Sequence, residues 1–223
     1  MFPELNSILN TTPESFTQGE FILVSDRQSD ASFLIHHFLS LYLRARCKVW
    51  FLGLVQSLNH YSAVSQRLGV SLAQAKEKGQ LVFLEGLKES LSVLIPQETN
   101  TGSQAMDFLR DPAVGLKSLY EFVRSGVSSS SGREEETDGA EEWGPPVLLV
   151  DDISVLLSLG VSVGAVLDFS HYCRATVCSQ LKVEVCWRRR QGDGQYTQKK
   201  LFQYKVHDKG ASFFARGTSS AVL

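Results

Sequence analysis

The sequence has no apolar run long enough to cross a bilayer, and its first residues, Met1 to Glu4, lack the positive start and apolar stretch of a secretion signal. Cysteine is scarce, and its spacing matches no zinc-binding pattern. Buried structural thiols are therefore expected at Cys47, Cys173, Cys178 and Cys186. These absences argue against a membrane or secreted protein. They favour a reducing compartment, the cytoplasm and also the nucleus.

What is present is ordinary for a soluble globular protein. The 223 residues are 43% hydrophobic and 21% charged, which fits a single α/β domain over residues 1–223. Strand-like and helix-like segments alternate, and this order predicts a mainly parallel sheet flanked by helices. The strand-like runs are 21–24, 47–52 and 80–85, and the helical patterns are 32–43, 57–68 and 71–78, the last two ended by Gly69 and Gly79.

The segment from Gly19 to Ser32 has the frame of a phosphate-binding loop without the residues that bind phosphate. A working P-loop reads G-x-x-x-x-G-K-[ST] after a buried strand. Here Ser25 and Asp30 stand where glycines belong, and Ala31 stands where the lysine belongs. Glycines let backbone N–H groups surround a phosphate and the lysine supplies counter-charge, so we expect no bound cofactor. By itself the segment is explained equally well as an ordinary strand–turn–helix with accidental spacing.

A later apolar strand, Val147 to Val150, runs directly into Asp151 and Asp152. An aspartate at this point resembles the magnesium-holding residue of nucleotide hydrolases. Ligands of open α/β sheets bind at the carboxyl ends of strands, so the position is suitable. The pattern alone is weak, because an aspartate after a buried strand is also a common turn or cap residue.

A polar segment precedes this strand. After a helix expected at 106–123, the chain becomes rich in serine and acidic residues without apolar periodicity. Such a segment buries too little surface to offset its ordering entropy. We therefore predict a disordered loop over 125–146.

The C-terminal part carries most of the positive charge. From Lys182 to Arg216 there are nine Lys/Arg and three Asp/Glu, although the whole chain has a net charge of −2. Strand-like runs separated by glycine turns from Lys182 onward predict an antiparallel β-meander. An RNA backbone is a possible partner for Arg188, Arg189, Arg190, Lys199 and Lys200; a solvated face of the meander is the favoured interpretation of these charges.

The histidines suggest no metal site. His36 and His37 are consecutive on a mostly apolar helix and so point in different directions. His60 and His171 lie in helical stretches without a second ligand at metal spacing. Structural roles are expected for all four, and no metal is expected.

The elements together resemble a RecA-like ATPase core, with a degenerate loop after the first strand, Asp151 after a later one and a C-terminal meander. Residues Val55 to Tyr61 resemble the segment that carries the catalytic glutamate of such enzymes. Gln56 and Ser57 stand in this neighbourhood, and neither can act as a general base.

Longer strings resemble one family, the sixth subunit of the Elongator complex. They cover most of the chain: Glu4–Asn6, Leu9–Pro13, Ser32–Ser40, Arg67–Leu72, Gly79–Lys88, Pro146–Gly160, Val166–Phe169, His171–Cys178 and Phe202–Leu223.

This resemblance implies a RecA-like fold without working nucleotide motifs. It also implies a six-membered ring with the fourth and fifth Elongator subunits, two copies of each, next to the remaining subunits of the complex. The complex modifies carbon 5 of the wobble uridine in certain tRNAs, and the ring is implicated in tRNA binding. The subunit would then be architectural and not an enzyme.

One departure from the family pattern is large. After Cys178 the family continues through further strands and loops, whereas this chain joins the later segment directly near 180–183. A block of the core is therefore expected to be missing, exposing apolar surface of the sheet. We expect this form to be less stable or less able to form the ring than a full-length relative.

Two other functions remain open on the sequence. One is an active nucleotide hydrolase with an unorthodox loop, which would bind ATP. The other is a RecA paralogue of the DNA-repair type, which would bind DNA and recombinases; the family strings argue against it.

Overall fold

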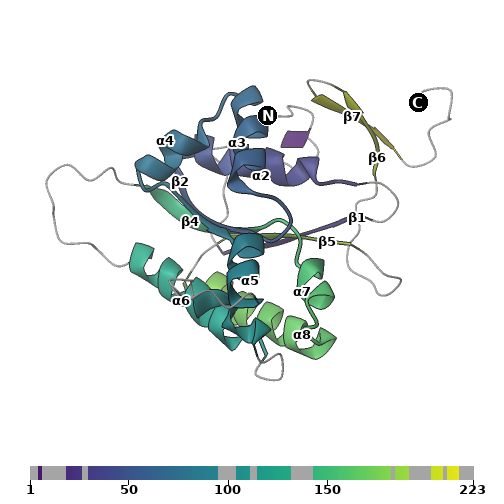
Figure 1. Ribbon diagram of the computed structural model, residues 1–223. Coiled ribbons are helices and arrows are strands. Elements are labelled where there is room, and N and C mark those ends of the chain that lie inside the picture. Colours follow the sequence, from purple (N-terminus) through teal and green to yellow (C-terminus); the bar gives the residue numbers. More distant parts are fainter. Residues whose placement is uncertain are drawn as a thin grey trace, which may run out of the picture.

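The computed structural model describes residues 5–6, 19–26, 30–94, 104–110, 115–131, 143–181, 184–190, 202–207 and 210–215. Its centre is a sheet of five parallel strands in the order β1-β5-β4-β2-β3 (Figure 1). The strands are β1 (Phe21–Asp26), β2 (Cys47–Gly53), β3 (Leu81–Glu85), β4 (Gly144–Val150) and β5 (Glu184–Arg190).

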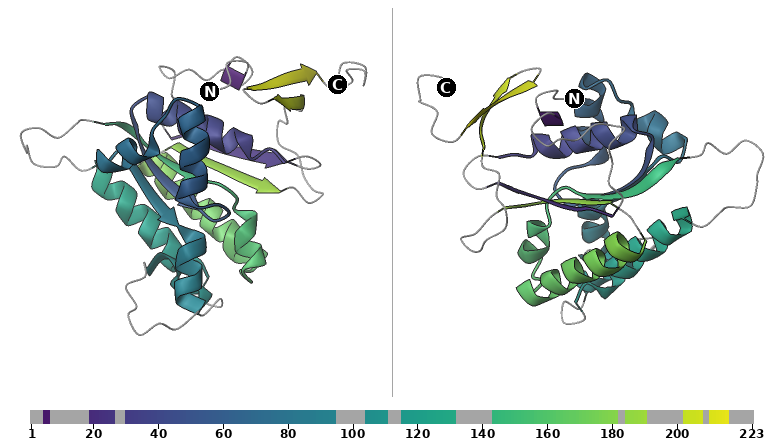
Figure 2. Two further views of the ribbon diagram at one scale, coloured as in Figure 1. Left: turned by 45° about the horizontal axis from the view of Figure 1, so that its top comes forward. Right: turned by 180° about the vertical axis from the view of Figure 1, so that it is seen from behind.

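Helices cover both faces of this sheet, as the two further views in Figure 2 also show. One layer holds α2 (Phe33–Arg44), α3 (Leu58–Arg67) and α4 (Leu72–Glu77). The other holds α5 (Gly86–Leu94), α6 (Lys117–Ser131), α7 (Ser154–Ser158), α8 (Val163–Tyr172) and the π-helix η3 (Cys173–Gln180). None of the helices within the described ranges is long and apolar enough to span a membrane.

The central strand β4 shows why the sheet needs two layers. Successive side chains of a strand point to opposite faces. Val147 and Leu149 join the core beneath α2, while Leu148 and Val150 join the core beneath α6. All four are buried, so the unbroken apolar run of β4 is explained by burial on both faces.

Helix ends follow the sequence signals. The hydroxyl oxygen of Ser57 accepts from His60 N–H at the start of α3, and that of Ser71 accepts from Gln74 N–H at the start of α4. Gly69 and Gly79 follow these two helices with φ of 78° and 73°, a backbone region that favours glycine. The predicted ends of both helices are confirmed.

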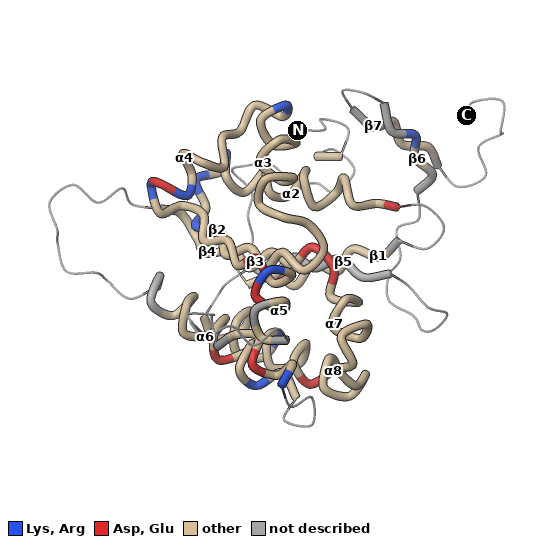
Figure 3. Tube along the Cα trace, in the orientation of Figure 1, with Lys and Arg blue, Asp and Glu red and all other residues tan. Residues whose placement is uncertain are grey.

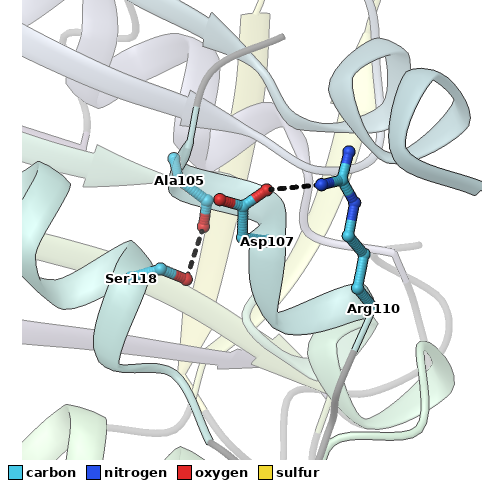
Figure 4. A network of polar contacts seen from close by, with 4 residues as sticks. All are labelled: Ala105, Asp107, Arg110 and Ser118. Atoms are coloured by element: carbon cyan, nitrogen blue, oxygen red, sulfur yellow. Dashed lines mark hydrogen bonds and ion pairs between the residues drawn. The ribbon is translucent and has the colours of Figure 1, made fainter. Parts of the chain in front are cut away.

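The helix predicted over 106–123 is two elements. The 3₁₀-helix η1 (Gln104–Leu109) packs on α6, and the Ser118 hydroxyl donates to the Ala105 carbonyl at 3.4 Å (Figure 4). Asp107 and Arg110 form an exposed ion pair at 4.0 Å in the same turn. An exposed pair of this kind adds little stability, so the buried side chains of η1 hold it in place.

The start and the end of the loop predicted over 125–146 are wrong. Helix α6 continues to Ser131, because Val123 and Val127 lie one turn apart and are both buried in the core. Strand β4 begins at Gly144, whose N–H donates to the Arg46 carbonyl at 2.8 Å. Residues 132–142 of the predicted loop lie outside the described residues.

The C-terminal strands also differ from a simple meander. Among the described strands, only β6 (Phe202–His207) and β7 (Gly210–Ala215) form an antiparallel pair. The preceding strand β5 instead enters the main sheet, parallel to both β1 and β4. Val185 is fully buried there. In the sheet, β5 thus lies between β1 and β4.

Candidate functional site

Asp151 lies at the carboxyl end of β4, where the sequence placed a candidate magnesium ligand. Its side chain is 2% exposed, and its two carboxylate oxygens accept four hydrogen bonds. Oδ1 accepts from the N–H groups of Leu54 and Asp152, each at 2.8 Å. Oδ2 accepts from the Val55 N–H at 2.9 Å and from the Tyr61 hydroxyl at 2.8 Å.

These contacts use the acceptor capacity of the carboxylate, which has about four lone-pair sites. They join β4 to the segment after β2 and to α3, elements that are far apart in the sequence. Burial raises the pKa of the Asp151 carboxyl group, and the four hydrogen bonds partly oppose this effect. In this geometry the Asp151 carboxylate connects these segments through hydrogen bonds. A metal ion at this carboxylate would have to displace several of them.

Two nearby carboxylates, those of Asp152 and Glu85, also accept hydrogen bonds from backbone N–H groups. Asp152 is buried, and its Oδ1 accepts from the Ser154 N–H at 2.9 Å, at the start of α7. Glu85, at the carboxyl end of β3, accepts from the Leu58 N–H at 3.1 Å, at the start of α3. Each carboxylate thus lies at the N-terminal end of a helix, where the helix dipole favours negative charge.

Gln56 and Ser57, which occupy the region of the RecA glutamate, are both exposed in the segment between β2 and α3. Ser57 caps α3. Within the described ranges, no group of three or more His, Cys, Asp and Glu side chains could hold a metal ion.

The turn after β1 has an internal carboxylate at the place where a P-loop would hold a phosphate. The Asp30 Oδ1 accepts from the Ser32 N–H at 2.8 Å, directly before α2. The N-terminus of a helix favours a negative group, and Asp30 supplies one from the chain itself. Ala31, at the lysine position, is 4% exposed, whereas Ser25 and Asp30 are exposed.

The C-terminal hairpin packs over this turn. The Tyr204 hydroxyl of β6 donates to the Asp30 carbonyl at 2.8 Å. The Tyr204 ring lies 5.0 Å from that of Phe33 and 6.2 Å from that of Phe213, between ring centroids. Leu5 is buried in the same small cluster. Tyr204, which lies 174 positions after Asp30, thus packs against the turn that leads into α2.

The candidate RNA-contact residues fall in two places. Strand β5 puts Arg188, Arg189 and Arg190 beside Val24, Ser25 and Asp26 of β1, at the carboxyl edge of the sheet. They therefore do not lie on an antiparallel meander. Lys199 and Lys200 lie outside the described residues.

The histidines of α2 are core residues. His36 and His37 are both buried, and the His36 ring contacts the rings of His60 and Tyr61, with centroids 5.6 and 5.1 Å apart. Burial lowers the pKa of His36 to about 4, assisted by the nearby His60, and burial also lowers the pKa of His37 to about 4. Cys47, Cys173 and Cys178 are buried thiols, as predicted.

Sequence reasoning missed Tyr61 and Tyr204, two tyrosines whose hydroxyl groups donate hydrogen bonds to distant parts of the chain. Tyr61 lies in a helical pattern, and its partner is 90 positions away. Tyr204 lies in a short strand, 174 positions from its acceptor. A buried tyrosine usually finds a hydrogen-bond partner, but only the fold shows which one.

Comparison with known proteins gives one family. The model of the family described as "Elongation complex protein 6" matches residues 2–184. Elongator complex protein 6 of Danio rerio is 51% identical over 275 aligned positions, and that of Homo sapiens is 42% identical over 274. Both alignments cover 100% of this chain and 100% of the relative.

The lengths also show what this chain lacks. It has 223 residues, so 52 of the 275 positions aligned with the Danio rerio protein have no residue here. The family match stops at residue 184, beside the predicted junction at 180–183.

Among solved structures, an uncharacterized protein from Pyrococcus horikoshii in complex with an unknown peptide has a similar fold. The TM-score is 0.55 at 10% identity, covering 95% of this chain and 87% of that one. The expected fold class is confirmed: a RecA-like α/β fold with a parallel sheet between helices and a small antiparallel sheet.

Proposed function

Because the chain belongs to the Elongator complex protein 6 family and is thereby an Elongator subunit, we propose that it acts in the complex without catalysis of its own. In this proposal it forms a hetero-hexameric ring with the fourth and fifth subunits, contacts the remaining subunits, and supports carbon-5 modification of the wobble uridine in tRNA. The proposed location is the cytoplasm and also the nucleus.

The observation that supports an architectural role most strongly is the state of Asp151. A magnesium-holding aspartate needs carboxylate oxygens that can face the ion and the phosphates. Here four protein donors use them. The Asp30 carboxylate at the start of α2 and the absence of the P-loop lysine at Ala31 support the same proposal. The degenerate loop is thus proposed to be a structural turn.

Ring assembly can be tested by co-expressing this chain with the fourth and fifth subunits, in parallel with the longer Danio rerio relative. We expect both proteins to co-purify in a complex of hexameric mass, measured by light scattering. We expect the complex of the shorter chain to melt at a lower temperature, because this chain lacks 52 of the 275 positions aligned with the relative.

Ring assembly and the predicted loss of stability can be contradicted independently of each other. If the relative assembles and this chain does not, the ring assignment is wrong for this chain. If both complexes melt at the same temperature, the missing block carries no stability in the ring. Wobble-uridine modification, measured by mass spectrometry of tRNA from cells deprived of the sixth subunit, should be restored in proportion to the assembled complex.

A further inference from the structure

Two histidines from different helices meet at the surface between α2 and α3. The centroids of the His36 and His60 rings are 5.6 Å apart, and the ring planes are inclined by 47°. His36 is 7% exposed, whereas His60 is exposed to solvent. The spacing of histidines along each helix gave no sign of this pair, because the fold brings its two members together from different helices.

The separation of the two rings fits two imidazoles bound to one metal ion. A zinc–nitrogen bond is about 2.0–2.1 Å long, so two imidazoles on a four-coordinate ion have ring centroids about 5–6 Å apart. The observed separation of 5.6 Å lies in this range. The two helices are therefore at a suitable distance for both histidines to contact the same ion.

One nitrogen of the His36 ring lacks a hydrogen bond within the described part of the chain. This atom is Nδ1, and it is buried. Most buried polar side-chain atoms have a hydrogen-bond partner, so an unsatisfied one calls for an explanation. Neutral imidazole is the commonest protein ligand of metal ions. At His60 the pair is open to solvent, so an ion can enter there and keep water ligands.

The backbone that carries the pair is held by other contacts. The Ser57 hydroxyl accepts from the His60 N–H at 3.4 Å and caps α3. Tyr61 follows His60, and its ring lies against that of His36 with the centroids 5.1 Å apart. The Tyr61 hydroxyl donates to Asp151 Oδ2 at 2.8 Å. The two histidines are therefore carried by elements that are anchored to the sheet through Tyr61.

The chemistry around the pair selects the class of ion. Neither α2 nor α3 carries an Asp or Glu, as Figure 3 shows. Among the described residues, no third His, Cys, Asp or Glu side chain joins the pair. Mg²⁺ and Ca²⁺ prefer oxygen ligands such as carboxylates, whereas imidazole suits Zn²⁺ and Ni²⁺. We propose that His36 and His60 together bind one Zn²⁺ ion, with water in its remaining coordination positions.

Calorimetric titration of the purified full chain with Zn²⁺, without an affinity tag and at about pH 7.5, tests this site. We expect saturable binding that His60→Gln weakens at least about tenfold, because the ion loses one of its two protein ligands. His60 is exposed, so this variant should fold. The matched control is His171→Gln, which makes the same change at an exposed position of α8 and should alter Kd less than about twofold.

Two further measurements separate metal binding from simple packing of the rings. Saturating Zn²⁺ should raise the Tm of the unmodified chain and of His171→Gln, because the ion binds the folded state, and should raise it less in His60→Gln. His36→Phe keeps a ring in the core and should lose the same zinc binding, with its folding checked by a cooperative melting transition without zinc. Histidines that only pack against each other would show neither response.

Four outcomes overturn the proposal. The first is no zinc binding by the unmodified chain. The second is an unchanged Kd in folded His60→Gln, which would place the zinc elsewhere, for example on a thiol. The third is a loss of affinity in His171→Gln as large as that in His60→Gln. The fourth is competition by Mg²⁺ as strong as that by Ni²⁺, which would indicate oxygen ligands. The isolated chain is used throughout, so failure of ring assembly would leave these measurements interpretable.

Discussion

Replacing Asp151 by asparagine is expected to lower the free energy of unfolding by about 2–4 kcal/mol. The asparagine has one acceptor oxygen and one NH₂ donor in place of two acceptor oxygens. One of the two donor pairs, Leu54 and Asp152 N–H or Val55 N–H and Tyr61 OH, would then face a donor. A buried donor without an acceptor is costly, so the loss should exceed that of an ordinary surface change. Chemical denaturation measures it.

Two further variants show whether the loss of unfolding free energy comes from the hydrogen bonds of Asp151. Tyr61→Phe removes only the hydroxyl donor and should cost about 1 kcal/mol. Asp168→Asn makes the same chemical change at an exposed position of α8 and should cost less than about 0.5 kcal/mol. If Asp151→Asn unfolds at the same denaturant concentration as the unmodified chain, the carboxylate is not a cross-link and its availability to a ligand must be reconsidered.

Acidification from pH 6.5 to pH 4 is expected to destabilise the fold through the two buried histidines of α2. The pKa of His36 and that of His37 are both lowered from 6.5 to about 4 by burial. The unfolded chain therefore binds protons at these groups before the folded chain does. Their contribution to stability is complete above pH 6.5 and is lost as the pH falls towards 4, by up to about 3 kcal/mol for each histidine.

The variant His36→Phe, His37→Phe keeps rings in the core and removes both titrations, so its stability should fall less steeply over this range. His171→Gln, at an exposed site of α8, should leave the slope of the unmodified chain unchanged. The raised pKa of Asp151 acts in the opposite direction, since its contribution is lost as the pH rises, but it is common to all three proteins and cancels in the comparison. Equal slopes for the double variant and the unmodified chain would contradict the assignment.

Much of the sheet could be predicted because its strands are short apolar runs that end at recognisable polar residues. β2, β3 and β4 lie where the pattern placed them, and Asp151 lies at the expected strand end. Local signals also located the ends of α3 and α4. The missed helix α5 begins at Gly86, directly after β3, with no linker to mark the boundary.

Contacts between distant residues could not be predicted. The sequence could suggest that Asp151 faces a ligand, but not that the N–H groups of Leu54 and Val55 would reach its carboxylate. The direction of β5 was also missed, because a strand followed by glycine turns looks the same whether it pairs in parallel or antiparallel fashion.

The central claim is that the groups at the carboxyl edge of the sheet bind one another and leave no nucleotide site. Calorimetric titration of the purified chain with ATP and magnesium tests it most directly. The contacts of Asp151 and Asp30, together with Ala31 at the lysine position, predict no binding heat up to millimolar ATP. Magnesium-dependent binding at micromolar ATP would contradict the claim and favour the nucleotide-hydrolase alternative.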